Sequence, residues 1–335
     1  MKAVTLGAPG GLDRLKLVDM PEPRDPTAGE IRVRLHASSL NYHDYRVVLG
    51  GIPTADGRIP MADGAGVVEA IGQGVTEFAV GDHVVSCFFP QWLDGPPTVG
   101  DFAAVPGDGV DGYAREIVVR PASWFTHSPR GFSHAESATL TTAGLTAWRA
   151  LVVDGGLKAG DTVLVLGTDG VSIFALQFAK RMGARVIATY SSDAKLERVR
   201  SLGADHTINY KTEPKWGDAV RQWTAGRGVD HVIEVGGPGT LPQSIAAVRI
   251  GGHIALIGAL TGRSGEIPIA ALFLKQVQLQ GLIVGNRRHQ QEMVRAIDAM
   301  GLRPVIDRTF NLETIADAFR HEESGKHLGK ICLEF

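Results

Sequence analysis

The chain has 335 residues, 44% of them hydrophobic and 21% charged, a length and balance typical of a globular protein with two domains. Its formal net charge of -2 at pH 7 argues against nucleic acid as the main partner. The 2 cysteines, Cys87 and Cys332, cannot form a four-cysteine zinc lobe and suit a reducing compartment. Because the N-terminus shows no long apolar run and no cleavage signature, we expect no signal peptide, no membrane span and a cytoplasmic location.

Residues 1–125 consist of short β-branched runs between Gly/Pro turns, a pattern that predicts a β-rich domain. The clearest runs are "IRVRLHASSL" (31–40), "GAGVVEAIGQGV" (64–75), "GDHVVSCFF" (81–89) and "AREIVVRP" (114–121). The segment 89–112 is rich in Gly, Pro and Asp and predicts a long surface loop.

From about residue 144, apolar strands alternate with helical patterns. The strands are "TVLVLG" (162–167), "RVIATY" (185–190), "HTINY" (206–210), "VDHVIEVGG" (229–237) and "HIALIGA" (253–259). Near-continuous apolar strands between amphipathic helices predict an α/β fold, a doubly wound parallel sheet covered on both faces. We expect its last strand at 279–285, with "TLPQSIAAVRIGG" (240–252) among the helical patterns. Two helices, 289–301 and 313–325, and a strand at 330–335 should follow.

The turn after the first of these strands is the candidate cofactor site. It consists of Gly167, Thr168, Asp169, Gly170, Val171 and Ser172. A helix that follows a glycine turn offers its N–H groups and its positive dipole end to a pyrophosphate. Asp169 replaces the second glycine of the dinucleotide pattern, and Ser172 replaces the third. We expect the Asp169 carboxylate to point away from the phosphates, which it would repel. These residues alone leave open a doubly wound domain that binds no nucleotide.

The second strand indicates which dinucleotide is bound. NAD-binding units carry an acid about 20 residues past the glycines for the ribose 2′-hydroxyl. No carboxylate comes before Asp193 here, and Ser191, Ser192 and Lys195 offer hydroxyls and a cation instead. Such groups can bind a 2′-phosphate and favour NADP(H). The alternative that Lys195 is only a solvated helix residue stays open.

The order and spacing of several motifs resemble the medium-chain dehydrogenase/reductase superfamily, in particular its zinc-independent quinone oxidoreductase-like and alcohol dehydrogenase-like members. These motifs are "SSLNYHDYRVVLGGIP" (38–53), "PMADGAGVVEAIGQGVTEFAVGDHVV" (60–85), "TTAGLTAWRAL" (141–151), "LGADHTINY" (202–210) and "GVDHVIEVGGPGTL" (228–241). The resemblance implies a GroES-like catalytic domain at 1–143 and 284–335 and a Rossmann domain at 144–283. It also implies a homodimer.

The chain departs from zinc-dependent relatives, which hold a catalytic zinc with Cys, His and Cys. Matching their motifs places Asn41 at the first ligand position, Ala62 at the second and Thr142 at the third. Asp63 stands where those relatives have a Glu. Since none of the three ligand types is present, we predict that the protein binds no zinc.

Without a metal, hydrogen-bond donors must stabilise the charge that hydride transfer creates on the acceptor oxygen. The resemblance brings Asn41, His43 and Thr142 near the nicotinamide. We expect Asn41 to donate to the substrate oxygen, His43 to deliver a proton and Thr142 to orient the substrate or the ring. His43 as an ordinary histidine bonded to Asp44 is the open alternative. The loop aromatics Phe89 and Trp92 would either cover a planar substrate or pack the loop down.

Further cofactor contacts follow from the resemblance. They are Thr146, Tyr210, Val235, Gly236, Ile257, Gly258, Ile283, Val284 and Gly285. The function that we predict is an NADPH-dependent, metal-free reductase of a small molecule, a quinone or an α,β-unsaturated carbonyl. The alternatives are an NAD(P)-dependent alcohol dehydrogenase without catalytic zinc and a non-enzymatic, crystallin-like protein that binds NADPH or nucleic acid.

Overall fold

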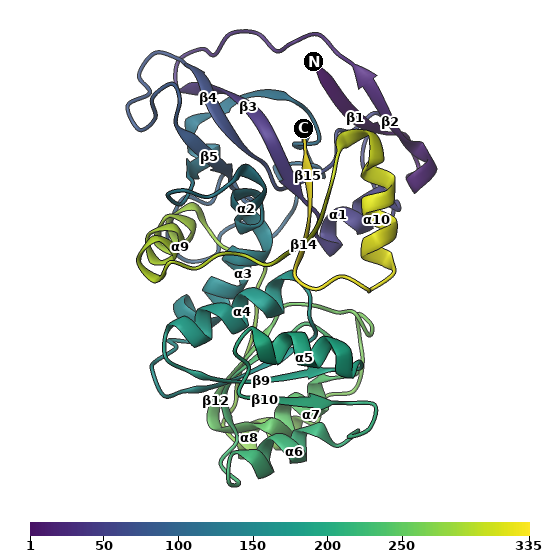
Figure 1. Cartoon of the computed structure of the whole chain (residues 1–335), viewed down its shortest axis with the longest axis vertical. Helices are drawn as coiled ribbons and strands as arrows, with labels where there is room; N and C mark the ends of the chain where they lie inside the picture. Colours follow the sequence, from purple (N-terminus) through teal and green to yellow (C-terminus); the bar gives the residue numbers. More distant parts are fainter. The chain divides into compact units, whose positions relative to one another are not determined.

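The computed structural model describes all residues from Met1 to Phe335. The chain divides into two compact units, Met1–Leu145 with Gly285–Phe335, and Thr146–Val284. Figure 1 shows the first unit in purple, blue and yellow and the second in teal and green. No helix of the chain is long and apolar enough to cross a lipid bilayer.

The first unit is built on a seven-stranded sheet of order β14-β15-β3-β4-β5-β7, in which β6 also pairs with β3. The strands are β3 (Glu30–Ser39), β4 (Ala65–Ile71), β5 (His83–Ser86), β6 (Ile117–Pro121), β7 (Phe125–His127), β14 (Ile306–Phe310) and β15 (Lys330–Glu334). A two-stranded sheet, β1 (Lys2–Leu6) and β2 (Leu15–Asp19), lies in the same unit. All four strands expected in the segment 1–125 are present, so the β-rich prediction is confirmed.

Four α-helices accompany this sheet: α1 (Tyr42–Val48), α2 (His134–Ala138), α9 (Arg287–Met300) and α10 (Ile315–Glu323). Both helices expected in the tail are present as α9 and α10. The sequence analysis did not predict α1, although Asn41 and Asp44 form a capping box at its start. Wide helical turns η3 (Leu140–Gly144) and η4 (Arg149–Val153) flank α3 (Leu145–Trp148).

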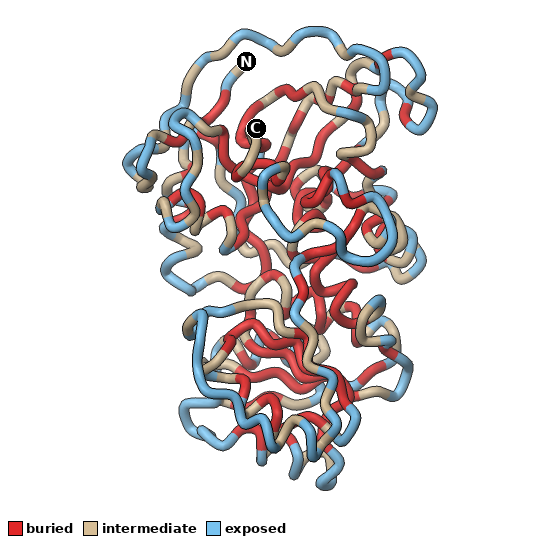
Figure 2. Tube along the Cα trace, turned by 180° about the vertical axis from the view of Figure 1, so that it is seen from behind, coloured by how far each residue is buried: buried red, intermediate tan, exposed pale blue.

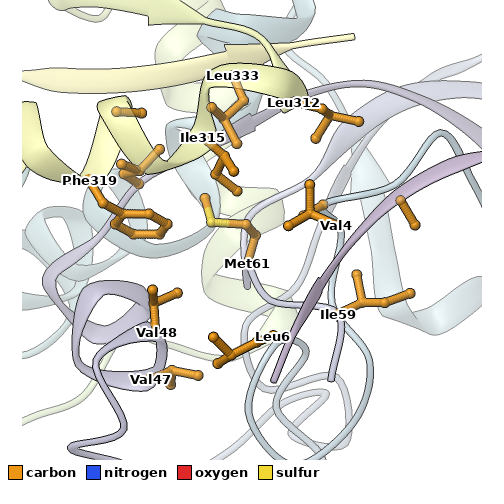
Figure 3. Close-up of a cluster of buried hydrophobic side chains, with 14 of the residues drawn as sticks. Val4, Leu6, Val47, Val48, Ile59, Met61, Leu312, Ile315, Phe319 and Leu333 are labelled. Carbon is orange, nitrogen blue, oxygen red and sulfur yellow. The ribbon is translucent and has the colours of Figure 1, made fainter. Parts of the chain in front are cut away.

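The C-terminal tail is part of the core of the first unit. Figure 3 shows side chains from β1, α1, α10 and β15 pointing toward one another around Met61. The labelled members of this cluster are Val4, Leu6, Val47, Val48, Ile59, Met61, Leu312, Ile315, Phe319 and Leu333. Met61 has a φ of 81°, a left-handed conformation that a bulky residue rarely adopts. The backbone directly before Ala62 and Asp63 is therefore conformationally constrained.

The second unit is a six-stranded parallel sheet of order β10-β9-β8-β11-β12-β13. Its strands are β8 (Thr162–Leu166), β9 (Arg185–Tyr190), β10 (His206–Asn209), β11 (Val229–Glu234), β12 (Val248–Leu256) and β13 (Gln278–Gly281). Its helices are α4 (Gly170–Arg181), α5 (Asp193–Ser201), α6 (Trp216–Trp223), α7 (Leu241–Ala247) and α8 (Ile269–Leu274). Central strands are buried, as the red tubes of Figure 2 show. The doubly wound parallel sheet is thus confirmed, and its order reverses at β8 and β11, where such sheets bind ligands.

Two element boundaries differ from the expectation. The pattern 240–252 reads as one helix, but α7 ends at Ala247 because Val248 already pairs with Val229 as the start of β12. The last strand, expected to run to residue 285, ends at Gly281. Val284 has a φ of 46°, which is incompatible with an extended strand.

Candidate functional site

The glycine turn between β8 and α4 is built around two side-chain hydrogen bonds. Gly167 has a φ of 86°, which favours glycine, whereas Asp169 has a φ of -74° that any residue adopts. The Asp169 carboxylate accepts a hydrogen bond from the Ser172 N–H at 3.0 Å and so caps α4. The Ser172 hydroxyl donates to the Leu166 carbonyl at 2.5 Å. The carboxylate is therefore held against the helix, and the N–H groups of Gly170 and Val171 remain for an anion, since the Ile173 N–H donates to the Asp169 carbonyl.

A lysine of α5 places its positive charge at the end of β9. Lys195 donates from Nζ to the Tyr190 hydroxyl at 2.9 Å and to Thr168 Oγ1 at 3.3 Å. Its ammonium also lies 4.6 Å from the centre of the Tyr190 ring. Asp193 accepts a hydrogen bond from the Asn209 amide at 2.8 Å. The Lys195 cation is fixed between β9 and the glycine turn, so it is more than a solvated helix residue.

Hydroxyl-bearing residues follow both β9 and the neighbouring strand β10. Ser191 and Ser192 are partly buried, and Tyr210, which follows β10, is 40% exposed. The Tyr210 N–H donates to the Tyr190 carbonyl at 3.1 Å, which places both tyrosines at the same edge of the sheet. Hydroxyls and an ammonium at the end of a second strand fit the 2′-phosphate of NADP(H).

The loop after β11 is organised by a residue that the sequence analysis missed. Glu234 is fully buried, and its Oε1 accepts the N–H groups of Gly236 at 2.8 Å and Gly237 at 3.0 Å. The same oxygen accepts the Thr240 hydroxyl at 2.6 Å. The sequence did contain a signal for this role, because Glu234 is a charged residue at the end of a largely apolar strand. Glu234 thus shapes the loop that begins with the predicted contacts Val235 and Gly236.

Ile257 and Gly258 follow the neighbouring strand β12. A Cβ atom on Gly258 would lie 2.2 Å from the Val235 carbonyl oxygen, so only glycine permits this close approach. The Ile257 N–H donates to the Glu234 carbonyl at 2.8 Å. The predicted contacts after β11 and β12 therefore lie side by side at the carboxyl edge of the sheet.

The segment 282–284 is held by Arg149, which sequence reasoning also missed. Its Nη1 donates to the carbonyls of Ile283 at 3.3 Å and Val284 at 3.4 Å, and its Nε donates to Asp154 at 3.0 Å. This buried clamp explains how Val284 is kept at positive φ. The predicted contact Thr146 is the first residue of the second unit. Gly285, another predicted contact, comes directly after its last residue.

In the first unit, Asp63 is the centre of a buried polar network. Its Oδ1 accepts the Thr142 hydroxyl at 2.6 Å. Its Oδ2 accepts the Ser39 hydroxyl at 2.5 Å and the Asn41 amide at 2.9 Å. Asn41 and Thr142, which the sequence analysis put together, are thus linked through one carboxylate.

A second carboxylate and a buried lysine complete this network. Asp44 accepts the Asn41 amide at 3.0 Å and the Ala62 N–H at 2.9 Å. Lys330 donates to Asn41 Oδ1 at 2.6 Å and lies 3.9 Å from Asp63 Oδ2. Burial raises the pKa of Asp63 to about 6, against the lowering effect of Lys330. The Asn41 amide hydrogens are directed at carboxylates, so the substrate-donor role expected for Asn41 is not available in this arrangement.

These residues do not fit a catalytic zinc. Both Asp63 oxygens already accept hydrogen bonds, from Thr142, Ser39 and Asn41. The Lys330 ammonium already supplies a positive charge beside them. No group of three or more His, Cys, Asp and Glu side chains is arranged to hold a metal ion. A divalent cation would have to displace this lysine or accept its repulsion.

His43 lies beside this network but pairs with another residue. Its Nε2 is 3.6 Å from Asp108 Oδ2, whereas the Asp44 oxygens are taken by Asn41 and Ala62. The open alternative of a His43–Asp44 bond is therefore wrong. Burial lowers the pKa of His43, while Asp108 opposes that effect.

The segment 89–112 has no strand or helix, but it is not simply a surface loop. Phe89 is 4% exposed and Trp92 is 2% exposed, and their ring centres are 6.3 Å apart. The Trp92 indole N–H donates to the Gly95 carbonyl at 3.1 Å. Both aromatics therefore pack the loop down, the second of the two roles considered for them.

Two family models match the chain. An alcohol dehydrogenase GroES-like domain matches residues 27–130, and a zinc-binding dehydrogenase domain matches residues 170–300. A zinc-type alcohol dehydrogenase-like protein of Schizosaccharomyces pombe is 41% identical over 335 residues, with 97% of this chain and 96% of that protein covered.

Three solved structures show the range of activities among similar folds. An NAD-dependent alcohol dehydrogenase has a TM-score of 0.89 at 34% identity, with 100% of both chains covered. A quinone oxidoreductase of Pseudomonas syringae has a TM-score of 0.83 at 28% identity, covering 100% of this chain and 99% of that one. A mycobacterial protein complexed with NADPH has a TM-score of 0.82 at 27% identity, with 100% of both chains covered. This chain belongs to the medium-chain dehydrogenase/reductase superfamily and is an oxidoreductase of that type.

Proposed function

We propose that this enzyme transfers a hydride from NADPH to a quinone or an α,β-unsaturated carbonyl, without a catalytic metal. The observation that carries the cofactor choice is the Lys195 ammonium, fixed by Tyr190 and Thr168 at the end of β9. A cation at this position favours a 2′-phosphate, and an acid that would bind a free 2′-hydroxyl is missing from the end of the strand.

The residues of the second unit fit the cofactor. The pyrophosphate would lie at the first turn of α4, and the 2′-phosphate would contact Lys195 with Ser191 and Ser192. When bound, NADPH supplies a hydride to the acceptor carbon. Arg149 and Glu234 act before binding, because they fix the loops that would contact the nicotinamide end.

The residues of the first unit hold the acceptor and supply the proton. Thr142 donates its only hydroxyl hydrogen to Asp63, so in this arrangement it orients the substrate through its fixed oxygen and methyl group and does not donate to the acceptor oxygen. Asn41 links Asp44 to Asp63 and is a positioning residue in this proposal. His43 is the proposed proton donor: burial lowers its pKa, so the charged imidazole gives up its proton readily.

The acceptor class follows from what the site offers. Hydride addition to a conjugated carbon leaves charge spread over an enolate or quinol oxygen, which protonation by a single group such as His43 can neutralise. Oxidation of a saturated alcohol needs stronger activation of the alkoxide, which zinc usually supplies. The quinone oxidoreductase of similar fold supports this acceptor class.

The test is NADPH oxidation against a panel of quinones and conjugated enones, with NADH and saturated alcohols as comparisons. We expect turnover with NADPH and at least one conjugated acceptor, and weak activity with NADH. An NAD(P)-dependent alcohol dehydrogenase without catalytic zinc is the second candidate, favoured by the names of the yeast relative and of one structural neighbour. Oxidation of a simple alcohol faster than reduction of any conjugated acceptor would select it.

Replacing Lys195 tests the cofactor choice directly. Lys195→Ala should raise the Kd of NADPH by about 10- to 100-fold, because a charge-assisted hydrogen bond contributes about 1.5–3 kcal/mol. The Kd of NADH should change by less than about twofold, as it lacks the 2′-phosphate. The exposed Lys158→Ala, in the same unit, is the matched control. Equal losses for both cofactors would contradict the assignment.

We also propose a homodimer, formed through α8 and the free edge of β13. β13 ends the order of the sheet, and α8 buries none of its side chains. Its residues Ile269, Phe273 and Leu274 are 69%, 66% and 71% exposed. An open edge beside a large exposed apolar helix is a surface that a second copy would cover. A reducing cytoplasmic setting is further proposed from the two free, buried cysteines.

A further inference from the structure

The loop 89–112 brings one carboxylate into the first unit beside a residue of α1. Asp108 is 7% exposed, and its Oδ2 lies 3.6 Å from His43 Nε2. We propose that Asp108 positions His43 and makes it the proton donor of the reaction. This inference rests on the proposed function and adds the group that sets the orientation and charge of the donor.

The two facing atoms, 3.6 Å apart, are both without a hydrogen bond. His43 Nε2 and Asp108 Oδ2 are both buried and form no hydrogen bond within the protein. Buried polar atoms without a partner cost about 1–3 kcal/mol each, a cost that a hydrogen bond between these two atoms would remove. A proton on Nε2 would join them after a shift of a few tenths of an ångström.

The other ring nitrogen of His43 is in a different situation. The His43 side chain is 17% exposed, and its buried Nε2 takes no part in that exposure. The imidazole therefore has its buried nitrogen beside a carboxylate, while another part of the ring is exposed, and we assign the transferable proton to Nδ1. This is the order of groups that holds an imidazole in one tautomer for acid–base catalysis.

Aromatic packing and a tight turn fix both side chains. The His43 ring centre lies 5.4 Å from that of Phe88 and 5.1 Å from that of Phe102. The Asp108 N–H donates to the Val105 carbonyl at 3.3 Å. A Cβ on Gly109 would lie 2.2 Å from the Phe102 carbonyl oxygen, so the turn beside Asp108 packs closely against the segment that carries Phe102. The loop thus places its carboxylate at one defined position.

The charges around the pair set its behaviour with pH. Burial lowers the pKa of His43, and the nearby carboxylates of Asp108 and Asp63 oppose it. Burial raises the pKa of Asp108, which His43 and Arg58 oppose and Asp44 reinforces. Removing the Asp108 charge therefore takes away the largest attraction that favours the imidazolium.

The proton step can be written with His43 alone. As the acceptor carbon takes the hydride, the carbonyl π electrons move to the oxygen, which takes the proton from Nδ1. The imidazolium becomes neutral imidazole, and Nε2–H stays directed at the Asp108 carboxylate. Solvent returns a proton to Nδ1 after the product leaves, so each turnover consumes one hydride and one proton.

The experiment compares Asp108→Asn with Asp94→Asn, an exposed acid of the same loop. Asp108→Asn should lower kcat about tenfold or more at neutral pH. The pH profile of kcat/KM should shift by about one pH unit toward acid, because the pKa of His43 falls without the nearby carboxylate. The Kd of NADPH should not change. NMR titration of the His43 ring should show the same shift without substrate. Asp94→Asn should leave kcat, the pH profile, the Kd of NADPH and the His43 titration as in the wild type. In a His43→Gln background, Asp108→Asn should cause no further loss of kcat.

Several outcomes would overturn the inference. One is a variant Asp108→Asn that folds, binds NADPH and keeps the wild-type pH profile and His43 titration. If that variant does not fold, Asp108→Glu takes its place, because it keeps the negative charge. We expect the wild-type His43 titration in Asp108→Glu, and an acidic shift of that titration would equally refute the pairing. A wild-type protein that binds no NADPH would end the proposed function, while the His43 titration would still report on the pair.

Discussion

At the scale of single residues, the turn that opens α4 resolves an apparent conflict. Asp169 replaces a glycine of the dinucleotide pattern, yet its backbone is extended and needs no glycine. Its carboxylate instead serves the helix, by capping the Ser172 N–H. The sequence alone can predict that an Asp before a helix caps it, but not whether a bound pyrophosphate would lie close to the charge.

Two substitutions of Asp169 separate its charge from its capping role. Asp169→Asn keeps the cap and removes the charge, so NADPH should bind equally or up to about fivefold more tightly, since such charges contribute about 1 kcal/mol at a helix end. Asp169→Gly should behave in the same way, at a small cost in stability. Fluorescence titration with NADPH measures both. A clear loss of affinity in the two variants would show that the carboxylate itself contacts the cofactor.

At the scale of helices and strands, local patterns located most elements. The β-branched runs became β3 to β6 and β8 to β12, because buried parallel strands leave strong sequence signals. The boundary at Ala247 was missed because pairing of Val248 in β12 overrides the helical pattern. The hydrogen bond between Asn41 and Lys330 could not be predicted, because Lys330 lies in β15, 289 residues away in the chain. Contacts at that separation have no local signature.

The buried network between β15 and the start of α1 should make a large contribution to stability. Lys330→Met leaves Asp44 and Asp63 buried without a cation, so unfolding free energy should fall by about 3–5 kcal/mol. The exposed Lys326→Met, which precedes the same strand, should change it by less than about 0.5 kcal/mol. Urea denaturation of both variants measures this. A loss below about 1 kcal/mol for Lys330→Met would contradict the role of the network.

The same network predicts a dependence of stability on pH. Burial raises the pKa of Asp63 to about 6 in the folded protein, above its ordinary value of 3.8, so the folded state binds more protons between these values. The contribution of this group to the unfolding free energy is therefore present at low pH and falls as the pH rises toward 6. In Asp63→Asn that fall should be absent, and denaturation at several pH values measures it. An identical slope in the variant and the wild type would show that Asp63 is ionised throughout.

At the scale of the whole molecule, the resemblance of ordered motifs predicted both the family and its two folds. It could not identify the loop carboxylate Asp108 or the clamp residue Arg149, because these contacts depend on three-dimensional packing rather than on motif spacing. The resemblance implies a homodimer but not the surface that forms it, which we propose from the exposed helix α8.

A charged substitution on that helix tests the proposed dimer. Phe273→Asp should convert the protein to monomers, because a buried charge without a partner is costly in an interface. Val80→Asp replaces an exposed apolar residue of the first unit, 63% exposed, and should leave the mass unchanged. Light scattering after size exclusion measures the mass. A wild-type protein that is monomeric at high concentration would contradict the dimer.

The central claim is that reducing equivalents pass from NADPH to an organic acceptor with protein groups in place of a metal. The most direct measurement is NADPH oxidation by a quinone, with the protein analysed for zinc and treated with a chelator beforehand. We expect turnover that is unchanged by the chelator, in protein without stoichiometric zinc. Loss of turnover on chelation, with recovery when zinc is added, would contradict it.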